Sequence, residues 1–296
     1  MTENNTRIIS SPAEVQSVAR QWKKEGLSIG LVPTMGYLHD GHRSLIHRAC
    51  AENNRVIVSV FVNPIQFGPT EDLATYPRDL EADAALCASE GVNIVFHPEP
   101  EDMYGPNFSS HVAVEKITSV LCGKSRPAHF QGVTTVVNKL FNISKADRAY
   151  FGEKDAQQLA VIRRMTEDLN IDIEICGCPI VREEDGLAKS SRNKYLSPKE
   201  RQAALILSRS LRLGKKMLDG GERNAETLRE AITAEICREP LAEIDYVSVV
   251  DALCLEDVEG EIKAPVLVAL AVNIGSTRLI DNFSYDIENP QDSQTE

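Results

Sequence analysis

Residues 31–42 read LVPTMGYLHDGH and continue a mostly apolar run, LSIGLV, over residues 27–32. A proline ends the run, a glycine follows, and His39 and His42 stand three apart before a periodic stretch over residues 43–50. This pattern predicts a buried strand, a tight loop and the start of a helix. Helix starts attract anions such as phosphate, because their first backbone N–H groups lack intrahelical partners and carry a partial positive charge. Two imidazoles there could donate hydrogen bonds to phosphate oxygens, although histidines at a helix start can also be caps or surface residues.

Composition limits the classes of function. The 296 residues are enough for one large or two moderate domains, and 42% apolar with 26% charged residues is ordinary for a globular protein. The formal net charge of -12 disfavours nucleic acid as a partner, because a phosphate backbone needs a basic face, but it permits a small anionic ligand. No secretory signal and no membrane span are expected. Seven scattered cysteines fit free thiols in a reducing compartment, so a cytoplasmic location is expected.

Strands and helices are predicted to alternate through the first part of the chain. Apolar, β-rich runs predict further strands at residues 55–62, 92–96, 111–114, 147–151 and 171–181. Helical patterns fall between most of them, including one over residues 133–142. This alternation predicts an α/β domain over residues 1–183, with a Rossmann-like parallel sheet whose ligands bind beyond the carboxyl ends of the strands.

The remaining chain, residues 184–296, has a different pattern. Residues 197–200 (SPKE) predict a capping box that opens a long helix, and a second helix follows from residue 224. Antiparallel strands are predicted at residues 246–250, 266–272 and 277–280. We therefore expect a smaller α+β domain, with a disordered acidic tail from about residue 288.

Four polar clusters follow predicted strands. They are His39 with His42, Asn63 with Gln66, residues 152–155 (GEKD), and the loop after Val181. The carboxyl ends of parallel strands meet at one edge of a sheet, so these clusters are expected to form one composite active site.

Each charged candidate also has an ordinary structural explanation. Lys154 could hold a phosphate or be a surface lysine at a helix start. Asp155 could accept hydrogen bonds from ribose hydroxyls or stabilise the helix macrodipole. Residues 189–192 (KSSR) suit either a loop that closes on a triphosphate or a solvated basic loop. Asp83 could reach a metal ion or be a polar helix residue, because Mg²⁺ takes few protein carboxylates.

Six longer strings carry a resemblance that covers nearly the whole chain. They are PTMGYLHDGH, VSVFVNPIQFGP, YPRD, RPAHFQGVTTVV, YFGEKDAQQL and KSSRNKYLS, in this order. The HxGH and KSSR pair resembles the HIGH and KMSKS motifs of the nucleotidyltransferase superfamily, and the full set resembles the pantothenate synthetase (pantoate–β-alanine ligase) family. The resemblance implies ATP-dependent condensation of pantoate with β-alanine through a pantoyl-adenylate, releasing AMP and diphosphate. It also implies ATP and Mg²⁺ as cofactors, and a homodimer formed through the first domain.

The resemblance assigns roles to matching residues. It implies His42 as the proton donor, with His39, Lys154 and Arg192 also contacting phosphates. Residues implied in ATP binding are Met35, Gly36, Tyr37, Leu38, His39, Asp40, Gly41, His42, Gly152, Glu153, Lys154, Asp155, Val181, Lys189, Ser190, Ser191 and Arg192. Residues implied in binding the other substrates are Gln66 and Gln158 for pantoate, Asn63 near β-alanine, and Arg126 and His129 in the pocket. Asp83 matches a carboxylate near the metal ion.

One position departs from the family pattern, and two rival functions stay open. Lys189 stands where many relatives carry an apolar residue, and it could add a phosphate contact or face solvent. Another small-molecule nucleotidyltransferase of the same superfamily would stop at a nucleotide-linked product. A regulatory protein would bind the nucleotide without catalysis, but the intact histidines, Lys154 and Arg192 argue against it. The acidic charge disfavours a tRNA-charging enzyme.

Overall fold

The computed structural model describes residues 6–69 and 71–289, and the chain divides into two compact units. Among the described residues, the first unit contains residues 6–69, 71–118, 125–153 and 158–178, and the second contains residues 119–124, 154–157 and 179–289. The second unit therefore includes two short segments from the middle of the chain, and the domain boundary at residue 183 stays a prediction.

The first unit is built on a six-stranded parallel sheet with the order β1-β4-β3-β2-β5-β6. Its strands are β1 (Arg7–Ile9), β2 (Ile29–Thr34), β3 (Arg55–Val60), β4 (Ile94–Phe96), β5 (Arg148–Gly152) and β6 (Glu174–Cys178). The predicted Rossmann-like parallel sheet is confirmed. The edge strand β1 was not predicted, because three residues are too few to show a periodic pattern.

Both faces of this sheet are buried. Successive residues of a strand point to opposite faces, so Leu31 packs into one core and Val32 into the other. The first core includes residues of α1 (Pro12–Lys24), α6 (His129–Ser144) and α7 (Ala156–Asp168). The second includes residues of α2 (Asp40–Glu52) and α3 (Leu80–Glu90). This double burial explains why the strands are continuous apolar runs in the sequence.

The strand predicted at residues 111–114 is wrong. The Val112 N–H donates to the hydroxyl of Thr135 at 3.0 Å, and the hydroxyl of Thr134 donates to the Val112 carbonyl at 2.6 Å. These side chains of α6 satisfy the backbone groups that a neighbouring strand would otherwise satisfy. The segment therefore stays irregular despite its β-rich sequence. The helix predicted over residues 133–142 begins earlier, at His129.

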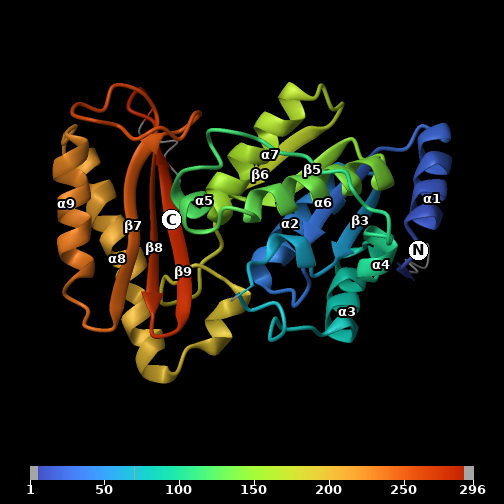
Figure 1. The fold of residues 1–296 in the computed structure, drawn as a ribbon, viewed down its shortest axis with the longest axis horizontal. Helices are drawn as coiled ribbons and strands as arrows, with labels where there is room; N and C mark the ends of the chain where they lie inside the picture. Colours follow the sequence, from blue (N-terminus) through green and yellow to red (C-terminus); the bar gives the residue numbers. More distant parts are fainter. Residues whose placement is uncertain (1–5, 70, 290–296) are drawn as a thin grey trace. The chain divides into compact units, whose positions relative to one another are not determined.

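The second unit packs two helices against a three-stranded antiparallel sheet (Figure 1). Its main elements are α8 (Pro198–Asp219), α9 (Ala225–Ile236), β7 (Ala242–Asp251), β8 (Val266–Ile274) and β9 (Thr277–Tyr285). The capping box at α8 is present, because Ser197 Oγ accepts the Glu200 N–H and the Glu200 carboxylate accepts the Ser197 N–H. The predicted α+β architecture is confirmed.

Short helices connect the larger elements. They are η1 (Pro64–Gln66), α4 (Pro100–Met103), α5 (Leu121–Ser125), η2 (Glu153–Asp155) and η3 (Ser191–Tyr195). No helix among residues 6–69 and 71–289 is long and apolar enough to cross a membrane. Most of the tail predicted to be disordered, residues 290–296, lies outside the described residues.

Candidate active site

The HxGH loop connects the carboxyl end of β2 to the start of α2. Gly36 and Tyr37 both have left-handed backbone conformations, with φ angles of 83° and 53°. A Cβ atom on Gly36 would lie 2.9 Å from a carboxylate oxygen of Asp83, so glycine is required there. The Thr34 hydroxyl holds the start of the turn, since it donates to the Ser59 carbonyl at 2.6 Å and accepts the Gly36 N–H at 3.1 Å.

His39 and His42 together cap the start of α2. Nδ1 of His39 accepts the Gly41 N–H at 3.1 Å, and Nδ1 of His42 accepts the His39 N–H at 3.3 Å. A neutral imidazole that accepts at Nδ1 carries its proton on Nε2. The geometry therefore assigns both rings as Nε2–H donors. From the sequence, the histidines could either cap the helix or contact phosphate. In the structure the two roles are compatible, because the cap uses Nδ1 and a phosphate contact would use Nε2.

The carboxylate of Asp83 anchors the HxGH loop. It is buried, and its two oxygens accept the Tyr37 N–H at 2.8 Å and the Leu38 N–H at 2.7 Å. Burial raises the pKa of the Asp83 carboxyl, although the two N–H donors act in the opposite direction. Consecutive N–H groups in a left-handed turn form a nest that binds anions. Here the protein's own carboxylate fills that nest, so these two N–H groups already have an anionic partner.

Asn63 and Gln66 form a buried amide network after β3. Nδ2 of Asn63 donates to Oε1 of Gln66 at 2.9 Å and to the Gly132 carbonyl at 3.1 Å, and the Tyr104 hydroxyl donates to Oδ1 of Asn63 at 2.7 Å. Nε2 of Gln66 donates to the sulfur of Met35 at 3.2 Å. The network fixes the orientation of the Gln66 amide and brings three predicted site residues, Met35, Asn63 and Gln66, into contact.

The predicted pocket residues Arg126, just before α6, His129, the first residue of α6, and Gln158 of α7 have different surroundings. Nδ1 of His129 lies 3.0 Å from the Gln66 carbonyl. Arg126 makes a two-pronged ion pair with Glu71, with nitrogen–oxygen distances of 2.8 and 2.5 Å. A substrate carboxylate at Arg126 would therefore compete with Glu71. Gln158 lies in the first turn of α7, partly exposed, and makes no side-chain hydrogen bond to another residue that the structure describes.

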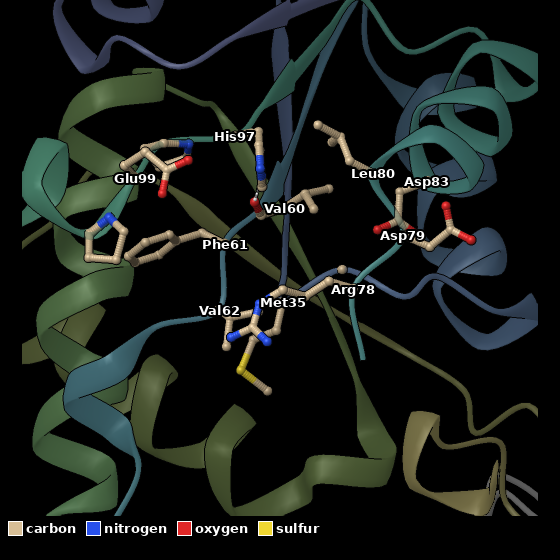
Figure 2. A pocket seen from close by; sticks show the side chains of 13 residues that line it. Met35, Val60, Phe61, Val62, Arg78, Asp79, Leu80, Asp83, His97 and Glu99 are labelled. Atoms are coloured by element: carbon tan, nitrogen blue, oxygen red, sulfur yellow. Dashed lines mark hydrogen bonds between the residues drawn. The ribbon is translucent and has the colours of Figure 1, made fainter. Parts of the chain in front are cut away.

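A cavity of about 230 Å³ lies at the carboxyl ends of β2, β3 and β4 and at the start of α3 (Figure 2). Met35, Gly36 and Asp83 are the predicted site residues that line it. His97 also lines it, and Nδ1 of its ring lies 2.7 Å from the Val60 carbonyl. Figure 2 shows Asp79 and Asp83 on one side of the cavity and Glu99 on the opposite side. The volume is below the roughly 300–1,000 Å³ of most ligand pockets, so the cavity is too small to enclose a whole nucleotide.

Residues 152–155 fall into both units. Gly152 ends β5, and the next residue, Glu153, is half-buried in the first unit. Burial raises the pKa of the Glu153 carboxyl, while Arg163 and Arg48 act in the opposite direction. Lys154 and Asp155 belong to the second unit, where Nζ of Lys154 lies 3.3 Å from Oδ2 of Asp155.

The KSSR loop leaves a short hairpin in the second unit. The Val181 carbonyl accepts the Lys189 N–H at 2.9 Å, so the predicted adenine contact and the first residue of the loop face each other. The Ser190 hydroxyl accepts the Arg192 N–H at 3.3 Å and caps η3, and Ser191 is buried. The KSSR loop therefore begins at a hydrogen-bonded hairpin and ends in a capped short helix, and this hairpin is called the base of the loop.

Ion pairs and amide hydrogen bonds support that base. Nδ2 of Asn193 donates to Oε1 of Glu183 at 2.9 Å and to the Ala188 carbonyl at 3.0 Å. Arg201 of α8 pairs with Glu183 at 2.9 Å and with Asp185 at 2.7 Å. The hydrogen bond from Arg201 holds the pKa of the Glu183 carboxyl below its ordinary value.

The donor set does not fit a preformed metal site. Among the residues that the structure describes, no group of three or more His, Cys, Asp or Glu side chains could hold a metal ion. Both oxygens of Asp83 already accept backbone N–H groups. The described residues therefore do not form a metal site by themselves, and the metal role of Asp83 stays a prediction.

Comparison with known proteins places the chain in a family. The sequence model described as pantoate-β-alanine ligase matches residues 7–284. The chain belongs to the pantoate-β-alanine ligase family. A pantothenate synthetase of Clostridium acetobutylicum is 62% identical over 280 residues, which cover 95% of this chain and 99% of that protein. One from Clostridium novyi is 61% identical over 274 residues, covering 93% and 96%. The resemblance carried by the motifs is confirmed.

Solved structures of this ligase family have the same fold. The pantothenate synthetase of Thermus thermophilus superposes with a TM-score of 0.88 at 43% identity, over 95% of this chain and 99% of that chain. The pantoate-β-alanine ligase of Francisella tularensis, in complex with β-γ ATP and β-alanine, gives a TM-score of 0.77 at 35% identity, over 96% and 98%.

Several residues that organise the site were not among the predicted ones. Tyr104 contacts Asn63 but comes from an irregular segment without a periodic pattern. Asp281 and Asn282 lie just beyond the strand predicted at residues 277–280. The sequence did hold a signal for Asp281, because it is an acid inside the apolar run LIDNF, and a buried acid needs a hydrogen-bonding or charged partner.

Proposed function

We propose that this ligase condenses pantoate with β-alanine at the cost of ATP, through a pantoyl-adenylate, and so makes pantothenate for the synthesis of coenzyme A. The observation that carries the proposal is the match to one ligase family over residues 7–284. The relative in complex with β-γ ATP and β-alanine supports two of the three substrates.

In the first step, a carboxylate oxygen of pantoate attacks the α-phosphorus of ATP. The new bond forms a mixed anhydride, and the bond from the α-phosphorus to the bridging oxygen breaks to release diphosphate. This reaction needs no protein nucleophile, because positioning and stabilisation of phosphate charge suffice. The Nε2–H groups of His39 and His42 are assigned to the phosphates, and Lys154 and Arg192 add positive charge.

The other candidate residues are assigned to one substrate each. ATP is assigned to residues 35–42, 152–155, Val181 and 189–192. Gln66 and Gln158 are assigned to pantoate, with Asn63 holding the Gln66 amide in a fixed orientation. Arg126 and His129 stay pocket candidates. The donation from Gln66 to the sulfur of Met35 supports a pantoate position next to the HxGH loop.

In the second step, the neutral amine of β-alanine attacks the acyl carbon of the adenylate. The new bond is the amide C–N bond, the bond to the phosphate oxygen breaks, AMP leaves, and the amine loses a proton. The KSSR loop, on the smaller domain proposed as a lid, would protect the adenylate from water.

Mg²⁺ is proposed to arrive with the triphosphate, since it usually binds through substrate phosphates and one or two carboxylates. A homodimer through the first unit and a cytoplasmic location are proposed from the family resemblance, and the free cysteines agree with a reducing compartment.

Pantoate-dependent exchange of labelled diphosphate into ATP, with Mg²⁺ and without β-alanine, tests the proposal. Exchange that requires pantoate, followed by pantothenate formation when β-alanine is added, is the expected result. Exchange with a different acid or a nucleotide-linked acceptor would instead assign a sister nucleotidyltransferase. Nucleotide binding without any exchange would assign a regulatory protein.

A further inference from the structure

We propose, on the basis of the function given above, that Asp281 and Asn282 of β9 are positioning residues for ATP. Neither side chain is assigned to a substrate. Each holds one of the two nucleotide-binding segments of the second unit, and the two residues are adjacent in the same strand.

Asn282 holds the segment that contains Lys154. Its side chain is buried, and its Nδ2 donates to the Lys154 carbonyl at 2.8 Å, across 128 positions of sequence. Residues 154–157 belong to the second unit although the residues on both sides of them belong to the first. The hydrogen bond from Asn282 is a direct attachment of this short segment to the sheet of the second unit.

Asp281 holds the hairpin that leads into the KSSR loop. Its buried carboxylate binds Arg182 through two hydrogen bonds of 2.7 and 3.1 Å. Arg182 pairs with Ala188 across the hairpin and also donates to the Gly186 carbonyl at 3.2 Å. The guanidinium therefore connects both sides of the hairpin to β9.

The two attachments share a rigid support. Oδ1 of Asp281 also accepts the Asn282 backbone N–H at 2.8 Å, and β9 is paired along its length with β8. Although β9 is an edge strand, it is hydrogen-bonded to β8 along its length, and a paired strand opens less readily than a loop. The backbone of Lys154 and the base of the KSSR loop are therefore held at a fixed spacing within this unit. Small displacements of phosphate-binding groups reduce binding and rate strongly, which makes this spacing part of ATP recognition.

Asn282→Ala tests the inference. We expect the KM for ATP in pantoate-dependent diphosphate exchange to rise roughly tenfold, the size of one lost hydrogen bond, while the KM for pantoate changes less than about twofold. Asn224→Ala is the matched control, since Asn224 also makes one side-chain hydrogen bond to a backbone group in this unit, capping α9 at 2.9 Å from the Thr227 N–H. It should lower the stability but leave the KM for ATP unchanged.

Asn282→Asp removes the hydrogen bond to the Lys154 carbonyl but keeps the size of the side chain. It is the main variant if Asn282→Ala does not fold. The carboxylate keeps the shape but cannot donate to the Lys154 carbonyl, so its KM for ATP should rise at least as much. An unchanged KM for ATP in the Asn282 variants, or an equal rise in Asn224→Ala, would overturn the inference. If the proposed function itself were wrong, the wild type would show no pantoate-dependent exchange. Calorimetric titration with ATP would then still compare the ATP affinity of the variants with that of the wild type.

Discussion

The imidazole rings of His39 and His42 lie with their centroids 4.1 Å apart, and Nδ1 of His42 accepts the backbone N–H of His39 at 3.3 Å. One nitrogen of each ring thus belongs to the helix cap, and the other is set as a donor. An imidazolium has no acceptor nitrogen, so protonation of either ring would break the cap that positions it.

His39→Asn should keep a side-chain cap on α2 but remove the Nε2–H donor of the imidazole. Asparagine is among the best N-cap residues, so thermal stability should stay close to that of the wild type, while diphosphate exchange falls by about 10²-fold or more, as for a lost transition-state donor. His42→Ala should cut exchange similarly and keep the fold. Calorimetry and exchange kinetics measure the two effects. Wild-type turnover in either variant would contradict the assigned roles.

Nitrogen NMR should report the tautomer directly. In protein labelled with ¹⁵N at histidine, His39 and His42 should each show a protonated Nε2 and an unprotonated Nδ1 at neutral pH. The His97 ring, whose Nδ1 lies 2.7 Å from the Val60 carbonyl, should show the opposite tautomer, because a carbonyl requires a donor. A protonated Nδ1 on either HxGH ring would contradict the reciprocal cap.

Asp83→Asn should loosen the HxGH loop. One oxygen becomes an NH₂ donor that faces a backbone N–H, so we expect a loss of about 1–3 kcal/mol in the free energy of unfolding and a higher KM for ATP. Urea unfolding and exchange kinetics at several Mg²⁺ concentrations provide the measurements. An effect confined to Mg²⁺ affinity would favour the metal role instead.

Gly132→Ala should disturb the Gln66 network. A Cβ atom at Gly132 would lie 2.5 Å from the Ile65 carbonyl and 2.6 Å from Cα of Gln66, so η1 would have to shift. We expect a loss of about 1–3 kcal/mol in stability and a rise in the KM for pantoate. Gly105→Ala, where a Cβ atom meets nothing within 4 Å, should change neither quantity. An unchanged KM for pantoate in Gly132→Ala would argue against the pantoate role of Gln66.

Glu183→Gln should change how stability depends on pH. The hydrogen bond from Arg201 lowers the folded-state pKa of Glu183, so its stabilisation is present above the ordinary glutamate pKa, about 4.3, and is lost as the pH falls through the lower, folded value. At neutral pH the variant should lose on the order of 1 kcal/mol. The difference should shrink on acidification below about pH 4. Urea unfolding across this range measures it, and a constant difference would contradict the linkage.

Much of the fold could be predicted because its signals are local. The continuous apolar runs at β2 and β3 reflect burial on both faces, and the SPKE capping box uses residues three apart. The histidine cap of α2 is equally local, since it needs only the spacing of HxGH. The motif strings also sufficed to identify the family, because they combine residue type with order and spacing.

The tertiary structure decided which distant groups meet. Asp83 holds the Tyr37 and Leu38 N–H groups from more than forty positions away, and Asn282 holds the Lys154 carbonyl from 128 positions away. It also decided that residues 119–124 and 154–157 belong to the second unit. Periodicity and capping act over a few residues, so they determine helices, strands and their faces. Which buried acid or amide finds which backbone group depends on how those elements pack, and only the folded chain establishes it.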